Sequence, residues 1–233
     1  TTLEEPTEGD VIVFDQSVVT NPQFTKKQIG VVHQEVIHTG FFDVIEILKF
    51  QSGYYGIKNN DERINYLLNK LSLTPHKHKK VKQLSGGMKR RLMIAKALVH
   101  SPKLLLLDEP TAGVDVELRE SLWKFVLELK AQGVSILLTT HYLEEAEKLC
   151  DRVGIINKGS LVYTGHPKEV IAKYSTKKIN LKTISGQSFI FTDSASKTIQ
   201  QILTEYKISF SDVADIQIEE GKLEEAFTKM VNL

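Results

Sequence analysis

The stretch Leu104-Leu105-Leu106-Leu107-Asp108-Glu109-Pro110 decides the fold class of this chain. Four consecutive leucines are typical of a short, fully buried strand in a parallel sheet. Asp108 and Glu109 follow where that strand ends, and ligands of open α/β folds bind at this carboxyl edge of the sheet. Two adjacent carboxylates there favour a magnesium ion bound to phosphates, with one carboxylate near the metal and the other beside a water molecule. A solvated strand end is the competing interpretation.

The segments around this strand predict the rest of a parallel sheet. Ser135–His141 is a second short apolar strand, and Val116–Ala131 between the two has the spacing of an amphipathic helix that ends at Gly133. A further strand is predicted at Gln28–His33. Short strands that alternate with helices indicate an α/β fold whose sheet is covered on both faces.

The region Glu35–His100 has helical periodicity. Apolar residues recur at three- and four-residue spacing over positions 41–48 and again over positions 64–71. The segment Pro75–Lys82 is polar and basic, and we interpret it as a solvated loop rather than a binding patch. The region is therefore expected to be a helical subdomain.

The residues after Tyr174 predict a small α+β appendix, preceded by a hairpin with Lys158-Gly159 at its turn. The expected strands of the appendix are Ile179–Ile184, Phe189–Thr192 and Asp215–Glu219, and its expected helices are 196–206 and Lys222–Val231. The chain then divides into the start of the sheet core at 1–34, the helical subdomain at 35–100, the remainder of the core at 101–174 and the accessory α+β domain at 175–233.

The composition excludes several classes of protein. Hydrophobic residues make up 41% and charged residues 25%, as in ordinary globular domains, so fibrous and disordered classes are excluded. The formal net charge of +1 argues against a dedicated nucleic-acid-binding protein. The single cysteine, Cys150, predicts no internal disulfide and a cytosolic location. Apolar runs are shorter than the roughly 18 to 20 residues of a membrane span, and Thr1–Pro6 does not look like a signal peptide.

A second chemical signal is the segment Leu84-Ser85-Gly86-Gly87, which precedes a helical run at Leu92–Val99. Two glycines let a backbone approach an anion closely, a serine hydroxyl is a donor, and a helix N-terminus carries free amide groups. This combination favours a phosphate, although Ser-Gly-Gly is also common in ordinary loops. We interpret the basic run Lys89-Arg90-Arg91 as a solvated helix start, or as a hint of an acidic or anionic neighbour.

Three motifs together resemble the ATP-binding cassette (ABC) ATPases. LSGGMKRRL begins at Leu84, LLLLDEPTAGVD at Leu104 and LLTTHYLEEAE at Leu137, in the order and spacing of the family. The resemblance covers about residues 1–170 and implies a P-loop NTPase-like parallel sheet core, incomplete at the N-terminus of this chain. The strings MKRR and KLEEAF, the latter at 222–227, are similar to the ABC-2 type exporter ATPases.

The resemblance also implies roles for single residues. Asp108 looks like the Walker B aspartate that supports magnesium, and Glu109 looks like the glutamate that acts on the attacking water. His141 is similar to the switch histidine that contacts the terminal phosphate, and Gln34 to the Q-loop glutamine that touches the metal and the water. Nucleotide contacts are implied for the signature and D-loop residues Ser85, Gly86, Gly87 and Asp115.

From these roles follows an expected function. The resemblance implies ATP and Mg²⁺ as cofactors, and ATP hydrolysis that powers an exporter through nucleotide-dependent dimerisation. The implied partners are a second ATPase subunit, as a homo- or heterodimer, and a transmembrane permease. The implied location is peripheral, on the cytoplasmic face of the membrane. No nucleic acid partner is expected. Two alternatives remain: a soluble ABC-type ATPase that acts on nucleic acid or ribosomes, and an interaction fragment without catalysis.

One departure from the family bears on activity. The phosphate-binding string G-x-x-x-x-G-K-[ST] does not occur in these 233 residues. In the family it lies just before a P-T-x-G turn, which resembles Pro6-Thr7-Glu8-Gly9 here, so Thr1–Leu3 is interpreted as the end of the helix that follows the phosphate loop. The expectation is a truncated chain that has little ATPase turnover by itself.

Overall fold

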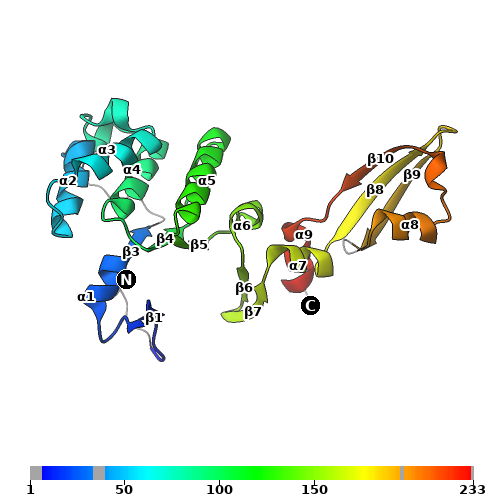
Figure 1. Ribbon diagram of the computed structural model, residues 1–233, viewed down its shortest axis with the longest axis horizontal. Coiled ribbons are helices and arrows are strands. Elements are labelled where there is room, and N and C mark those ends of the chain that lie inside the picture. The colour runs from blue at the N-terminus through cyan, green and yellow to red at the C-terminus, as the bar shows by residue number, and fades with distance from the viewer. Residues whose placement is uncertain (1–6, 34–39, 195–196, 232–233) are drawn as a thin grey trace. The chain divides into compact units, whose positions relative to one another are not determined.

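The computed structural model describes residues 7–33, 40–194 and 197–231 (Figure 1). The chain folds into two compact units, Thr1–His141 and Tyr142–Leu233. The finer division into four segments, with boundaries after residues 34, 100 and 174, stays a prediction. Among the described residues, no helix is both long enough and apolar enough to cross a membrane.

The first unit contains the predicted parallel sheet. Its strands are β3 (Ile29–Val32), β4 (Leu104–Asp108) and β5 (Ser135–Thr139), in the order β3-β4-β5. Both pairs are parallel, and the register places Leu105 opposite Gly30 on one side and opposite Ile136 on the other. The strand predicted at Leu104–Asp108 has the observed bounds, but it is not fully buried, because Leu104 and Leu106 are only partly covered.

Helix α5 (Val116–Ala131) joins β4 to β5 and has the predicted bounds. Its buried face holds Leu118, Leu122, Trp123, Phe125, Val126 and Leu129. Trp123, which is 7% exposed, is therefore a core residue. A long apolar face on one side of the helix explains why the sequence pattern located it so well.

Helical cover differs between the two faces of the sheet. Val32, Leu105 and Leu107 lie on one face and are buried. Gly30 lies on the same face, where an added Cβ would be only 2.3 Å from the carbonyl oxygen of Ala97 in α4 (Gly86–Leu98), so this helix packs directly on the strand. Leu137 lies on the opposite face and is 60% exposed. The expectation of cover on both faces is therefore not met along β5 in the described residues.

The helical subdomain consists of α2 (Val44–Tyr54), α3 (Asp61–Lys70) and α4, with short 3₁₀ turns at Thr74–His76 and Val81–Gln83. Their packed sides bury most of the predicted periodic residues, including Val44, Leu48, Ile64, Leu67 and Leu68. Phe41 differs, because it lies before α2 and is 78% exposed. The segment predicted as a solvated loop differs at one residue, because Val81 is fully buried. One apolar residue among basic residues produces no periodic pattern, so its burial was not predicted from the sequence.

Before the sheet, the chain forms a small hairpin and a short helix. Strands β1 (Ile12–Val13) and β2 (Gln16–Ser17) are joined by Phe14 and Asp15, which both have positive φ, as a tight hairpin turn requires. Helix α1 (Pro22–Gln28) begins at a proline, which suits the first helical position because its missing N–H is not needed there. This helix was not predicted from the sequence.

The second unit begins with α6 (Leu143–Leu149), the hairpin of β6 (Val153–Asn157) and β7 (Ser160–Gly165), and α7 (Pro167–Tyr174). An antiparallel sheet follows, in the order β10-β8-β9, from β8 (Thr176–Thr183), β9 (Ser188–Ser194) and β10 (Val213–Glu219). Helices α8 (Ile199–Glu205) and α9 (Leu223–Val231) complete it, with a 3₁₀ turn at Phe210–Asp212. Helix α9 shares a buried core with Ala146 of α6, Ile155 of β6 and Val170 of α7.

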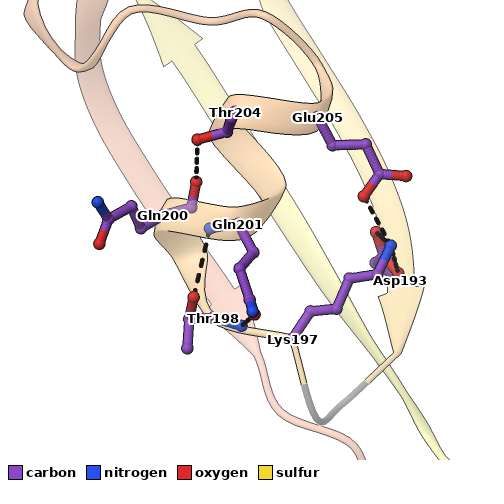
Figure 2. A network of polar contacts seen from close by, with 7 residues as sticks. All are labelled: Asp193, Lys197, Thr198, Gln200, Gln201, Thr204 and Glu205. Carbon is purple, nitrogen blue, oxygen red and sulfur yellow. Dashed lines mark hydrogen bonds and ion pairs between the residues drawn. The ribbon is translucent and has the colours of Figure 1, made fainter.

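Polar contacts fix the start of α8 beside β9 (Figure 2). The Lys197 ammonium lies 3.0 Å from an Asp193 carboxylate oxygen and 2.7 Å from one of Glu205. Thr198 and Gln201 form a reciprocal capping box. The backbone N–H of Gln201 donates to the Thr198 hydroxyl, and the backbone N–H of Thr198 donates to Oε1 of Gln201. These contacts explain why a helix of only seven residues is held in a defined place.

Candidate functional site

The predicted acidic residues lie at the carboxyl ends of two neighbouring strands. Asp108 ends β4, and the parallel register places it opposite Thr139, which ends β5. The Thr139 hydroxyl donates a hydrogen bond to Oδ1 of Asp108. Thr139 was not predicted as a site residue, although the register of the two strands carries that information. The hydroxyl fixes one carboxylate oxygen and leaves the exposed side of Asp108 open to a ligand.

Glu109 and His141 form the second pair of the site. Nδ1 of His141 lies 2.9 Å from Oε1 of Glu109, and the side chains of His141 and Glu109 are 58% and 24% exposed, respectively. The two side chains therefore meet at the carboxyl edge of the sheet, whereas their roles in catalysis stay predictions. An ion pair results when the imidazole is protonated, and a neutral imidazole makes a hydrogen bond in the same place.

The backbone of Glu109 has an unusual conformation. Its φ is +44°, in the left-handed region that residues with a Cβ rarely adopt. Its N–H donates to the carbonyl oxygen of Thr139 at 2.9 Å, which continues the pairing of β4 with β5 by one residue. A strained residue of this kind persists where its surroundings determine it strongly, and such residues concentrate at functional sites.

The signature segment opens helix α4. The Ser85 hydroxyl accepts a hydrogen bond from the Met88 N–H at 3.3 Å and thereby caps the helix. Gly86 has open space where a Cβ would be, which agrees with the expectation of an accessible backbone. Gly87 has a different reason to be glycine, because a Cβ there would lie 2.5 Å from Cδ2 of Leu118 in α5.

The D-loop residue Asp115 is the N-cap of α5. Its Oδ1 accepts a hydrogen bond from the Leu118 N–H at 2.8 Å. Asp115 is exposed, so this cap leaves its second oxygen available to solvent or to a ligand. Asp115 therefore has a helix-capping role that was not assigned from the sequence, and its contact with nucleotide stays a prediction.

Arg90 is the site residue that was misinterpreted from the sequence. It was assigned to a solvated helix start, yet it is 4% exposed. Its guanidinium donates to four backbone carbonyl oxygens: that of Pro110 at 2.9 Å, Asp108 at 2.8 Å, Glu109 at 2.7 Å, and that of His33. These carbonyl groups lie at the ends of β3 and β4, and the suggested acidic or anionic neighbour stays a prediction. The remaining predicted site residue, Gln34, lies outside the described residues.

The oxygen atoms at this edge suit a hard cation. Magnesium prefers oxygen ligands and is commonly held by one or two carboxylates together with substrate phosphates and water. Asp108 supplies such a carboxylate, fixed by Thr139, and Glu109 stands next to it. The described residues contain no cluster of three or more His, Cys, Asp or Glu side chains that could hold a metal. A carboxylate such as that of Asp108 suits a Mg²⁺ ion whose other ligands are phosphate oxygens and water.

Comparison with known proteins gives this geometry a family. The model of the ABC transporter family matches residues 1–112. The linearmycin resistance ATP-binding protein LnrL of Bacillus subtilis (strain 168) is 32% identical over 232 residues, which are 97% of this chain and 75% of that protein. The chain belongs to the ATP-binding proteins of ABC transporters.

Other ABC ATP-binding proteins match a shorter part of the chain. The Nod factor export ATP-binding protein I of Sinorhizobium fredii (strain NBRC 101917 / NGR234) is 39% identical over 171 residues, which are 72% of this chain and 50% of that protein. The chain thus spans half the length of that relative. Its namesake in Cupriavidus metallidurans (strain ATCC 43123 / DSM 2839 / NBRC 102507 / CH34) is 36% identical, again over 72% of this chain and here 56% of the relative.

Solved structures agree with the family. An ATP-binding subunit of an ABC transporter superposes with a TM-score of 0.67 at 27% identity, covering 72% of this chain and 71% of that one. CbiO1 of Clostridium perfringens, part of the ABC transporter complex cbiONQ, superposes with a TM-score of 0.64 at 27% identity, covering 73% and 71%. The P-loop NTPase-like α/β fold class and the ABC-type ATPase assignment are confirmed.

Proposed function

We propose that this ABC subunit hydrolyses ATP at the edge formed by Asp108, Glu109 and His141, and that this hydrolysis powers export. The observation that carries the proposal is the 2.9 Å contact between Glu109 and His141, directly beside the Walker B aspartate. Asp108 as a metal-binding carboxylate, Glu109 as a base and His141 as a hydrogen-bond partner of the phosphate form a set of groups that suits phosphoryl transfer to water.

Each residue then has a chemical role. Asp108 would hold Mg²⁺, which would neutralise charge on the phosphates. Glu109 orients the attacking water and accepts its proton while the water oxygen bonds to the γ-phosphorus and the bond to the β–γ bridging oxygen breaks. His141 hydrogen-bonds an oxygen of the terminal phosphate and keeps Glu109 oriented. Gln34 would contact the metal and the water, a role that rests on the family resemblance alone.

The signature segment serves the nucleotide of a second subunit. Ser85, Gly86 and Gly87 stand at the N-terminus of α4, where amide groups and the helix dipole favour an anion. In a head-to-tail dimer this end of the helix closes the partner's ATP, and Asp115 completes the same wall. The second subunit is another copy of this chain or a homologous ATPase.

A membrane-embedded permease is the second proposed partner. The relatives named above include proteins for Nod factor export and linearmycin resistance, which supports an exporter. Helix α2 and the residues just before it expose Phe41, Phe50 and Tyr54, at 78%, 56% and 79%. Exposed aromatic residues of this density are typical of protein interfaces. We propose that a cytoplasmic segment of the permease covers them, which places the subunit on the cytoplasmic face of the membrane.

The proposal is tested with Glu109→Gln in the natural protein that contains these residues. Loss of the base is expected to lower ATP turnover by about 10²-fold or more. The variant should also accumulate as an ATP-bound dimer, which light scattering detects at saturating ATP and Mg²⁺. Glu117→Gln is the matched control, because Glu117 is an exposed carboxylate in the first turn of α5. A Glu109→Gln protein that stays monomeric and turns over normally would contradict the proposed roles.

We further propose that the 233 residues by themselves turn over ATP near background. They contain no G-x-x-x-x-G-K-[ST] string, and each lost charge-assisted contact to a phosphate costs about 1.5 to 3 kcal/mol. Steady-state phosphate release by this chain at saturating ATP and Mg²⁺ is the test. Turnover well above the background rate would show that a different group binds the phosphates.

A further inference from the structure

We infer that Arg90 is a positioning residue, which holds the backbone of Glu109 in the conformation that presents its carboxylate to the attacking water. The inference rests on the proposed function, since it concerns the glutamate assigned there as the base. Arg90 lies in the first turns of α4, only three residues after Gly87 of the signature segment. Its side chain hydrogen-bonds the backbone carbonyl groups of residues 108–110, so Arg90 influences the reaction only by positioning Glu109.

The first observation is where the hydrogen bonds of the guanidinium end. Nη2 donates to the carbonyl oxygens of Asp108 and Glu109, at 2.8 and 2.7 Å, and Nε donates to that of Pro110, at 2.9 Å. These are the carbonyl of Glu109 and those of the residues on either side of it. One buried side chain thereby fixes both peptide planes that flank the α-carbon of Glu109.

The second observation is the conformation that these bonds hold. Glu109 has a φ of +44°, which a residue with a Cβ adopts only when the surrounding structure enforces it. Without Arg90, the peptide groups of residues 108–110 would be free to relax toward an ordinary negative φ. That rotation changes the direction of the Cα–Cβ bond and so carries the carboxylate away from His141, which it now meets at 2.9 Å.

The chemistry of arginine suits this task. A guanidinium has five N–H donors in a planar fork, whereas a lysine ammonium has three donors on one atom. The carbonyl oxygen of His33, at the end of β3, accepts from Nη1 on the opposite edge of the fork. Lysine does not reproduce this distribution of donors over three nitrogen atoms. A buried cation also requires such partners, because an unpaired one is strongly destabilising.

A purely structural role is the competing explanation. Arg90 would then only join α4 to the ends of β3 and β4, by pairing with buried carbonyl groups that cost free energy when they are left without a donor. What argues for positioning is that the guanidinium binds the carbonyl oxygens of Glu109 and of both its neighbours, and that Glu109 alone among these three residues has a positive φ.

The test compares Arg90→Met and Arg90→Lys in the natural protein, with Arg63→Lys as the matched control. Arg63 is a partly buried guanidinium that also donates to a backbone carbonyl, that of Leu98 at the other end of α4. We expect kcat to fall at least 10-fold in both Arg90 variants while KM for ATP changes less than 3-fold. Arg63→Lys should keep its kcat. Should Arg90→Met fold poorly, Arg90→Lys retains the stem and the charge and carries the test.

A second measurement does not depend on ATP. Amide hydrogen exchange reports the opening of local structure, and the Glu109 N–H is bonded to Thr139. We expect this amide to exchange at least 10-fold faster in the Arg90 variants, with amides in α5 unchanged. Unaltered exchange at Glu109 or an unaltered kcat overturns the inference. Faster exchange together with normal turnover by Glu109→Gln would instead sink the proposed function of Glu109, while leaving the hold of Arg90 on its backbone in place.

Discussion

Replacing Gly30 by alanine tests how closely helix α4 approaches strand β3 of the sheet. The added Cβ would lie 2.3 Å from the carbonyl oxygen of Ala97 and 2.9 Å from Cγ of Pro102. Real Cβ atoms essentially never approach other heavy atoms closer than 3.0 Å, and a helix carbonyl cannot rotate away as a side chain can. Helix α4 must therefore shift by several tenths of an ångström or more for the variant to fold.

The size of the effect follows from overpacking. An extra methyl group in a well-packed core costs about 1 to 3 kcal/mol. Because each kcal/mol lowers the melting temperature by roughly 2 to 4 °C in proteins of 150 to 250 residues, Gly30→Ala should melt about 2 to 12 °C lower. The same shift of α4 displaces Arg90, so ATP turnover should fall as well.

A control substitution has the opposite expected sign. Gly53 is exposed near the end of α2, and nothing lies within 4 Å of its added Cβ. Gly53→Ala should therefore leave the melting temperature unchanged or raise it slightly, because alanine is favoured over glycine in a helix by up to about 1 kcal/mol. Circular dichroism melts of both variants, recorded side by side, decide the matter. Gly30→Ala at the wild-type midpoint would refute the close approach.

Two further predictions concern pH and the Walker B aspartate. Burial lowers the pKa of His100 below its ordinary value of about 6.5. The hydrogen bond to the Ile29 carbonyl raises this pKa, and the positive charge of the nearby Arg63 lowers it further, so that the pKa remains below the ordinary value. In acid the unfolded state then binds more protons than the folded state, so the stability that is present above about pH 6.5 is lost as the pH falls through the pKa of the folded state. The urea midpoint of His100→Gln should therefore depend less on pH, between about 7.5 and 5.5, than the urea midpoint of the wild type. Thr139→Val removes the hydroxyl that bonds Asp108, so the magnesium concentration for half-maximal turnover should rise several-fold, and an unchanged magnesium dependence would exclude this support.

The sequence predicted those parts of the fold that have long apolar signals. The four leucines before Asp108 and the apolar face of Val116–Ala131 gave elements with the observed bounds. The helices that were missed, α1, α6 and α7, have only seven or eight residues each, which is about two turns. So short a segment shows little periodicity, and its helix depends on caps and on tertiary contacts.

The candidate site divides in the same way. The meeting of Glu109 with His141 was predictable, because parallel strands that are neighbours end at one edge. The burial of Arg90 was not, because hydrogen bonds from a guanidinium to backbone carbonyls do not depend on the side chains of the accepting residues and so leave no signal in the sequence. The left-handed φ of Glu109 also has no sequence signal, since glutamate is seldom found there. The roles of the site residues, and of Gln34 in particular, stay predictions.

The close approach of Gly87 to Leu118 bears on the proposed association of two subunits. It places the beginning of α4 beside the beginning of α5, whose N-cap is Asp115. Two segments that are distant in the sequence thus lie together within one subunit. In the dimer proposed above, segments that are already packed together would lose less conformational entropy on association than two separate loops.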